Sequence, residues 1–448
     1  MTERNLATKV ISNVVHAHYA WYIVAIGTTL QLTTNFVSQA YAILLVVMRD
    51  NFGWSLTAIV LAYSIRNIIG AVMSPWAGAM GDRYGAKKVM LVGAGFFMGG
   101  LLLLSTINAI WQLFLYYSLI LGIAQAMFRV NVPTTVAIWF KKRLGVAVGI
   151  QQSAGGMGAS ILAPGLAVLL TQTDWQTAFL LIGSVGGGFV FLLLAFFHSE
   201  PADRGKQPYG SEEDNDSPVA AFSAAVAKVR SQVFMRHARG TRAFWFLPLI
   251  HHLGCVGHAI VIVHGINYAT TRGVSLETAT FIISIYSGTS IISRLVAPIL
   301  ADHLGAKGVM ALFYALQGVS VLMLFWTQDA WQFYLFAAVF GIGFGGEMSA
   351  FLVVNRQYFG MGPVRTVFCI QSMGAGLGMA LGGLIGSVIY DSLGSYNLAW
   401  LISVAASLGG MVAIITMEST KRELVPEWED ALPADAREPA IAPSAADD

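Results

Sequence analysis

Four charged side chains interrupt long apolar runs of the sequence, and they are the residues best placed to do chemistry. They are Arg66, Arg129, Arg294 and Glu347. If these runs cross a bilayer, a charge inside them is costly and marks a solute pathway or a paired site. A guanidinium stays charged and donates two parallel hydrogen bonds to a carboxylate. We therefore predict that Arg129 and Arg294, together with Arg66, contact an anionic solute.

Each of these charges also has a structural interpretation. Arg294 stands toward the end of its run and could extend to the membrane surface. Arg66 could hold a neighbouring helix through its carbonyls, and Arg129 could form a static ion pair with Glu347. Alternatively, Glu347 carries a coupled proton, since movement between a desolvated site and an arginine would load and release it.

Uncharged polar side chains at helical spacing extend this candidate site. Histidine can donate to a solute oxygen, and His251 and His258 share one helix face, although hydrogen-bonded packing is the alternative for both. We predict that the solute site includes Asn35, Tyr41, Gln152, Gln371 and His258. No cysteine or acid stands at ligand spacing from the histidines, so no metal and no other cofactor is expected.

The composition indicates a membrane protein. Of the 448 residues, 56% are hydrophobic and 11% are charged, whereas soluble domains carry about 25% charged residues. A soluble fold could not keep this much apolar surface from water. The net charge of +2 does not suggest a nucleic-acid partner, and two cysteines inside apolar runs imply no disulfide framework.

A spanning helix needs roughly 20 mostly apolar residues, and twelve stretches qualify. Their limits are 20–48, 55–77, 88–107, 111–139, 144–171, 176–197, 243–268, 277–300, 307–326, 331–355, 364–389 and 396–417. The predicted fold is therefore all-α, with a first six-helix bundle at 20–197 and a second at 243–417. A short N-terminus (1–19), a polar central loop (198–242) and a disordered tail (418–448) complete the chain, which we expect to act as a monomer in a lipid bilayer.

The distribution of positive charge predicts the orientation. All but five of the 26 Lys and Arg residues lie in even-numbered junctions, the central loop or the termini. Because cytoplasmic loops carry the excess of Lys and Arg, both termini are expected in the cytoplasm, as in a multi-pass protein of the inner (plasma) membrane.

The two halves of the chain repeat. Gly85-Ala86-Lys87 recurs 220 residues later as Gly305-Ala306-Lys307, and Gln152-Ser153 recurs as Gln371-Ser372. A parallel repeat of six-helix halves predicts a pseudo-two-fold axis along the membrane normal, with a solute site between the halves. Small residues at every fourth position, from Gly374 to Gly386, predict close helix packing, in either a static or a moving interface.

A charged turn follows the second predicted helix, with the sequence Gly78-Ala79-Met80-Gly81-Asp82-Arg83-Tyr84-Gly85-Ala86-Lys87-Lys88. It resembles the loop signature of the major facilitator superfamily. A degenerate copy, which contains Asp302, follows the eighth helix. The resemblance implies the major facilitator fold and a gating role for Asp82, Arg83 and Asp302.

A second resemblance is to monocarboxylate transporters and the related oxalate–formate exchangers. It rests on the run from Trp139 to Gly149, on Ala163-Pro164, and on Arg294, eight residues before Asp302. In that group the matching arginine contacts a substrate carboxylate. An acid one turn before it is replaced here by Ser290, so the usual proton-coupling residue is not present.

Together these features predict a secondary transporter of a small organic anion, a mono- or dicarboxylate. It would work by alternating access, coupled to a proton or a counter-anion. The alternative is an exporter of amphiphilic or drug-like compounds, although a cationic-drug site would need more buried acids than Glu347. An enzyme is not expected, because no nucleophile elbow, metal motif or phosphate loop is present.

Overall fold

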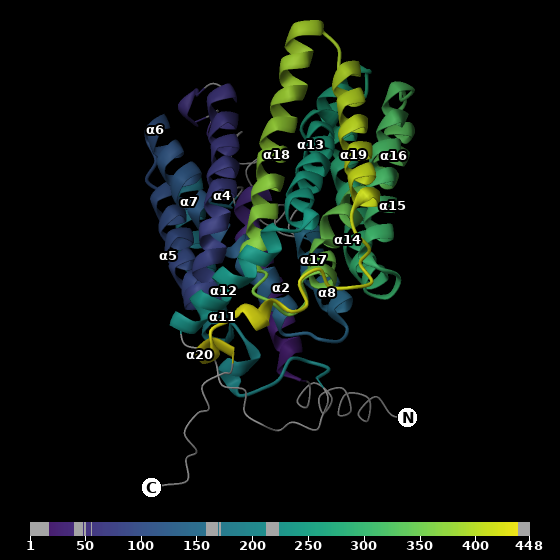
Figure 1. The fold of residues 1–448 in the computed structure, drawn as a ribbon. Coiled ribbons are helices and arrows are strands. Elements are labelled where there is room, and N and C mark those ends of the chain that lie inside the picture. The colour runs from purple at the N-terminus through teal and green to yellow at the C-terminus, as the bar shows by residue number, and fades with distance from the viewer. Residues whose placement is uncertain are drawn as a thin grey trace, which may run out of the picture.

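A computed structural model describes residues 18–39, 48, 51–54, 56–157, 169, 172–211 and 224–437. Two groups of helices stand side by side, one from each half of the chain (Figure 1). The N-terminal bundle contains α2 (Tyr19–Gln39), α4 (Leu56–Tyr84), α5 (Ala86–Leu104), α6 (Ile110–Leu113), η1 (Phe114–Ile120), α7 (Leu121–Ile138), α8 (Leu144–Met157), α10 (Trp175–Leu181), η3 (Ile182–Gly186) and α11 (Gly187–Phe196).

The C-terminal bundle has the same order of long helices. It contains α13 (Arg242–Thr271), α14 (Leu276–Leu304), α15 (Ala306–Val321), η5 (Leu322–Phe325), α16 (Ala330–Ser349), α17 (Phe351–Phe359), α18 (Arg365–Leu393) and α19 (Asn397–Thr416). Each of the twelve predicted segments contains a helix. In the described part of the chain, nine helices or continuous helical stretches are long and apolar enough to cross a membrane. The other three predicted spans correspond to α2, α4 and α8.

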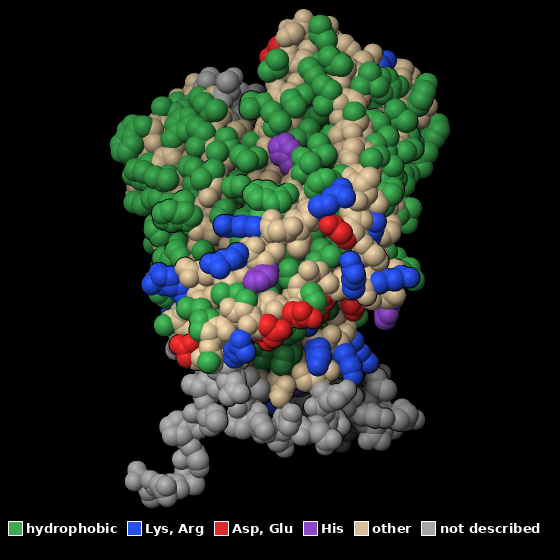
Figure 2. All heavy atoms as spheres, viewed as in Figure 1, with side chains coloured by type: hydrophobic (Ala, Val, Ile, Leu, Met, Phe, Trp, Pro, Cys, Tyr) green, Lys and Arg blue, Asp and Glu red, His purple; other side chains and the backbone are tan. Residues whose placement is uncertain are grey.

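The outer surface explains why the composition is so apolar. Large side chains such as Leu192 on α11 and Leu384 on α18 are exposed, and hydrophobic atoms cover the upper part of the face seen in Figure 2. A helix that is apolar on every side suits a lipid environment rather than water. Lys, Arg, Asp and Glu gather instead at the lower end in this view, which we call the charged end.

Glycines set the distance between helices in two different ways. The ridge from Gly374 to Gly386 packs on α13 of the same bundle, where a methyl group at Gly378 would collide with the carbonyl oxygen of His252. Gly145 and Gly149 of α8 lie instead against the backbone of α14 in the opposite bundle. The predicted ridge on α18 therefore lies inside one bundle, whereas Gly145 and Gly149 of α8 lie where the two bundles meet.

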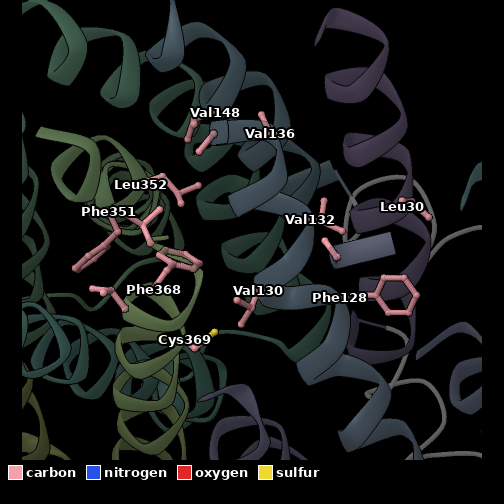
Figure 3. Close-up of a cluster of buried hydrophobic side chains, with 14 of the residues drawn as sticks. Leu30, Phe128, Val130, Val132, Val136, Val148, Phe351, Leu352, Phe368 and Cys369 are labelled. Carbon is pink, nitrogen blue, oxygen red and sulfur yellow. The ribbon is translucent and has the colours of Figure 1, made fainter. Parts of the chain in front are cut away.

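An apolar cluster also crosses between the bundles (Figure 3). Val130 and Val148 of the N-terminal bundle belong to the same buried cluster as Phe351 and Phe368 of the C-terminal bundle. Within a membrane, such side chains stabilise the contact through van der Waals packing rather than through transfer from water. The bundles are thus joined by packing as well as by polar contacts.

The charged end is covered by segments from the central loop and the tail. They are η4 (Pro201–Arg204), α12 (Ala224–Arg239), η6 (Trp428–Ala431) and α20 (Ala434–Arg437). Trp428 packs edge-on against Phe234 of α12, with ring centroids 5.2 Å apart. Arg230 of α12 donates to the carbonyl oxygen of Ala436 over 2.8 Å and forms an ion pair with Glu429.

The prediction of a disordered tail was therefore wrong for residues 418–437. Its composition is polar on average, but Val425, Trp428 and Leu432 are buried. These three side chains find apolar partners on neighbouring segments, which an average over the tail does not reveal. Residues 438–448 lie outside the described part.

Candidate functional site

A cavity of about 240 Å³ lies between the two bundles. Four helices of each bundle contribute to its wall, so the cavity is at the place that the sequence repeat predicts. Its lining residues are Gln31, Thr34, Asn35, Tyr63, Asn67, Gln125, Phe128, Arg129, Pro133, Gln152 and Gly155 from the N-terminal bundle. From the C-terminal bundle they are His251, His258, Arg294, Phe344, Met348, Phe368, Ser372 and Met379.

Five of the predicted solute contacts line this cavity. They are Asn35, Arg129, Gln152, His258 and Arg294. Tyr41 lies outside the described residues. Residue 348, the counterpart of Arg129 under the repeat, is a methionine that lines the opposite wall. The repeat therefore places equivalent positions on the same cavity, although their chemistry differs.

Arg294 reaches the cavity from α14 and does not extend to the surface. The residue is 8% exposed, and its guanidinium lies 4.9 Å from the ring centroid of Phe344. A methyl group at Gly155, on the opposite bundle, would lie 3.4 Å from its Nη1 atom. The guanidinium therefore lies beside the α8 backbone of the opposite bundle. Such cation–π contact contributes about 0.5–2 kcal/mol.

Arg129 faces the same cavity from α7 and is half-buried. In the described part of the chain it forms no ion pair with an acid. The predicted alternative, a static pair with Glu347, is not present. The two arginines thus bring positive charge to the cavity from opposite bundles.

Glu347 lies behind the cavity wall. It is fully buried, and its Oε2 atom is 3.5 Å from Nδ1 of His258. Gly254 leaves space for this carboxylate on α13, since a methyl group there would collide with Oε1. His258 lines the cavity and contacts Met379 Sδ through Nε2 at 3.1 Å. The imidazole therefore stands between the cavity and the only acid predicted to lie at mid-membrane.

Two of the predicted solute contacts, Arg66 and Gln371, are not among the residues that line the cavity. We therefore do not propose them as solute contacts. Arg66 is buried inside the N-terminal bundle, where Nη1 donates to the hydroxyl of Tyr117 over 3.5 Å. Gln371 forms a reciprocal pair with Asn355, with both amide hydrogen bonds at 2.8 Å. Both side chains therefore hold helices of one bundle together.

At the charged end, two equivalent carboxylates hold the bundles together. Asp82, near the end of α4, accepts hydrogen bonds from the backbone N–H (3.1 Å) and hydroxyl (2.6 Å) of Thr366 on α18. Asp302, near the end of α14, accepts from the backbone N–H of Gly145, the second residue of α8, over 3.1 Å. Each acid lies at the positive N-terminal end of a helix from the other bundle, which stabilises its charge.

Arg365 reinforces this contact and was not predicted from the sequence. Its Nη1 atom lies 3.8 Å from Asp82 Oδ1 and 3.4 Å from Glu200 Oε1, and Nη2 donates to the Ser199 carbonyl oxygen over 3.1 Å. Arg83, for which gating was predicted, is exposed, and its guanidinium lies 4.9 Å from the ring centroid of its neighbour Tyr84. The arginine that joins the bundles is therefore Arg365.

Comparison with known proteins places this arrangement in a family. The model of the Major Facilitator Superfamily matches residues 24–271 and 251–444. The chain is 22% identical over 390 residues to the oxalate:formate antiporter of Oxalobacter formigenes, covering 86% of this chain and 88% of that protein. It is 25% identical over 346 residues to monocarboxylate transporter 11 of Mus musculus, covering 75% and 73%.

Solved structures share the fold. The proton:xylose symporter XylE superposes with a TM-score of 0.69 at 14% identity, covering 92% of this chain and 98% of that one. A bacterial homologue of the iron transporter ferroportin, in an outward-facing state, gives 0.65 at 14% identity, covering 88% and 98%. At this identity the likeness concerns the fold alone.

The contacts of Arg365 predict how the charged end opens. Cys369 is buried where α18 packs on Gly78 of α4, so its thiol reports separation of the bundles. In a Cys255→Ala background, Arg365→Gln should raise the rate of Cys369 alkylation by a maleimide. Loss of a buried charged contact costs about 1–3 kcal/mol, which corresponds to a rate increase of roughly five- to 150-fold.

Arg83→Gln is the matched control, because Arg83 stacks on its own neighbour, and it should leave the rate unchanged. Asp82→Asn should act like Arg365→Gln. Equal labelling of the Arg365 and Arg83 variants would show that the ionic contact does not hold the bundles together.

Proposed function

Because this chain belongs to the major facilitator superfamily, it is a multi-pass membrane transporter and not an enzyme, and we propose that it carries a small organic anion. The solute is a mono- or dicarboxylate, moved by alternating access. The observation that carries the proposal is the pair Arg129 and Arg294, which line one cavity from opposite bundles. The superfamily predicted from the loop motif is confirmed.

The charge of the cavity wall supports an anion. Two arginines and no acid occur among the lining residues described. Two fixed guanidinium charges in a partly desolvated space repel a cation and stabilise a carboxylate, which each can bind through parallel hydrogen bonds. Glu347 is set back behind His258, so it does not offer the cavity a direct contact for a cation.

The size of the cavity supports a small solute. Sites for drug-sized ligands are about 300–1,000 Å³, and this cavity is about 240 Å³. The names of the relatives point the same way, since they refer to oxalate, formate and monocarboxylates. An exporter of large amphiphilic compounds is therefore the less favoured function.

The positions of the contacts between the bundles support alternating access. The bundles meet at the charged end through Asp82, Asp302 and Arg365, while the two cavity arginines repel each other until an anion lies between them. A bound anion would lower this repulsion and allow the bundles to rock about the site. We assign the charged end and both termini to the cytoplasm, and the protein to the inner (plasma) membrane as a monomer, on the distribution of Lys and Arg.

We assign the coupled proton to Glu347. A buried carboxylate is stable when it is protonated or paired, and His258 connects it to the cavity at 3.5 Å. Arrival of an anion beside His258 would draw a proton toward the imidazole and couple its uptake to that of the solute. Exchange for a counter-anion is the alternative mode, and it would need no titrating residue.

Removal of Arg294 should abolish anion binding while the fold is kept. Short carboxylates should raise the melting temperature of the purified protein, and Arg294→Ala should weaken their apparent affinity roughly ten- to hundred-fold, since hydrogen bonds between charged groups contribute about 1.5–3 kcal/mol. Arg83→Ala is the control and should keep the wild-type shift. Stabilisation by cations alone, or an undiminished carboxylate shift in Arg294→Ala, would exclude the proposed cargo.

Glu347→Gln separates the two coupling modes. In proteoliposomes, uptake driven by a proton gradient should fall at least about tenfold, because the amide cannot carry a proton across. Exchange of labelled for unlabelled solute, measured in the same vesicles, should persist. Uptake that keeps its full dependence on pH would mean that another group, or no group, carries the proton.

A further inference from the structure

One side chain in the cavity wall has hydrogen-bonding capacity that the described protein atoms do not use. His251 of α13 is 4% exposed and lines the cavity between the bundles. Neither of its ring nitrogens has a hydrogen-bond partner in the described part of the chain. A buried polar group without a partner costs about 1–3 kcal/mol, so such groups call for a partner or a function.

The other histidines of α13 provide the comparison. Nδ1 of His252 lies 3.1 Å from the Gly374 carbonyl oxygen, and Nε2 of His264 lies 2.9 Å from the Gly383 carbonyl oxygen. His258 contacts Met379 and Glu347. Each of these imidazoles has a protein partner that explains it as a packing residue or as part of an ion pair, and His251 does not.

The ring of His251 is held in one orientation. It stacks on Phe351 with ring centroids 4.0 Å apart and an interplanar angle of 15°. Phe351 is the first residue of α17, directly after Ala350, where the helical segment from Ala330 to Phe359 changes from α16 to α17. The stack uses the face of the imidazole and leaves its edge, which carries both nitrogens, free to bind. A donor held in this way loses little rotational freedom on binding.

We propose that His251 is a solute-binding residue whose imidazole N–H donates to an oxygen of the transported anion. This proposal rests on the proposed function. A neutral imidazole has one donor and one acceptor, and a carboxylate has about four lone-pair sites. If one arginine binds a carboxylate through two hydrogen bonds and the other through one, a lone-pair site remains for a further donor. Phe351 is a positioning residue, which acts on the solute through the ring of His251.

A third contact would determine selectivity. Two guanidinium groups attract any small anion of suitable charge, including halides. An N–H group at a fixed position raises the affinity for a solute with an oxygen at that place. It lowers the affinity for a solute that leaves the buried donor unpaired. His251 thus distinguishes carboxylates from spherical anions in the same cavity.

The test uses full-length protein and carboxylate-induced thermal shifts, with chloride as the spherical anion. His251→Phe, which retains a ring to stack on Phe351, should weaken carboxylate affinity about tenfold and leave chloride unaffected. His251→Gln keeps an N–H donor and should restore most of the affinity. Phe351→Leu removes the stack and should give an intermediate loss. His252→Gln, on the adjacent residue whose partner is a backbone carbonyl, is the matched control and should bind as the wild type does.

The outcomes separate this inference from the proposed function. If His251→Phe binds carboxylates as tightly as the wild type while Arg294→Ala does not bind them, His251 is not a solute contact and the anion site stands. A lower melting temperature of His251→Phe without solute, with an unchanged solute-induced shift, would likewise overturn the inference, because it shows a structural role only. If the wild type binds no carboxylate, the proposed function is wrong, and the inference about His251 is wrong with it.

Discussion

The structure depends on the cost of placing positive charge in an apolar interior. Arg129 and Arg294 occupy a buried cavity at the junction of two bundles, and in the described part of the chain neither is neutralised by an ion pair with an acid. A charge in such a place is tolerated when it faces a hydrated cavity or a counter-ion. Under the proposed function, the anionic solute is the counter-ion. The positive charge that makes the empty site costly therefore also makes it selective for anions.

The remaining polar residues are arranged so that they do not cancel this charge. Glu347 contacts His258 and occupies the space beside Gly254, and it forms no ion pair with either cavity arginine in the described part of the chain. Asp82 and Asp302 lie at the charged end, each on a helix N-terminus of the opposite bundle. Asp82 and Asp302, together with Arg365, therefore join the bundles at one end, whereas Arg129 and Arg294 keep the cavity positive. Alternating access needs both the contacts at the charged end and the positive cavity, because the contacts that close one end must break when a solute fills the cavity.

The helices, the repeat and the cavity arginines could be predicted from the sequence, since each is encoded by local composition or by spacing. The features that the sequence did not reveal depend on partners from distant segments. Gln371 matches Gln152 in the repeat, but Asn355 binds it, and the equivalent position in the first half is Val136. In the sequence, Arg365 does not differ from other positive residues at helix ends. Its role depends on Asp82 and Glu200, which lie beside it only in the folded chain. The packed tail depends on a few apolar side chains among many polar ones, and His251 is distinguished only by the absence of a partner.

The central claim is that fixed guanidinium charge, rather than shape, selects the solute. The most direct measurement is calorimetric binding of short mono- and dicarboxylates to the wild-type protein, compared with their uncharged amide isosteres. The account predicts that a carboxylate binds at least about a hundredfold more tightly than its amide, as two charge-assisted contacts would give. Equal affinity for the acid and the amide would contradict it.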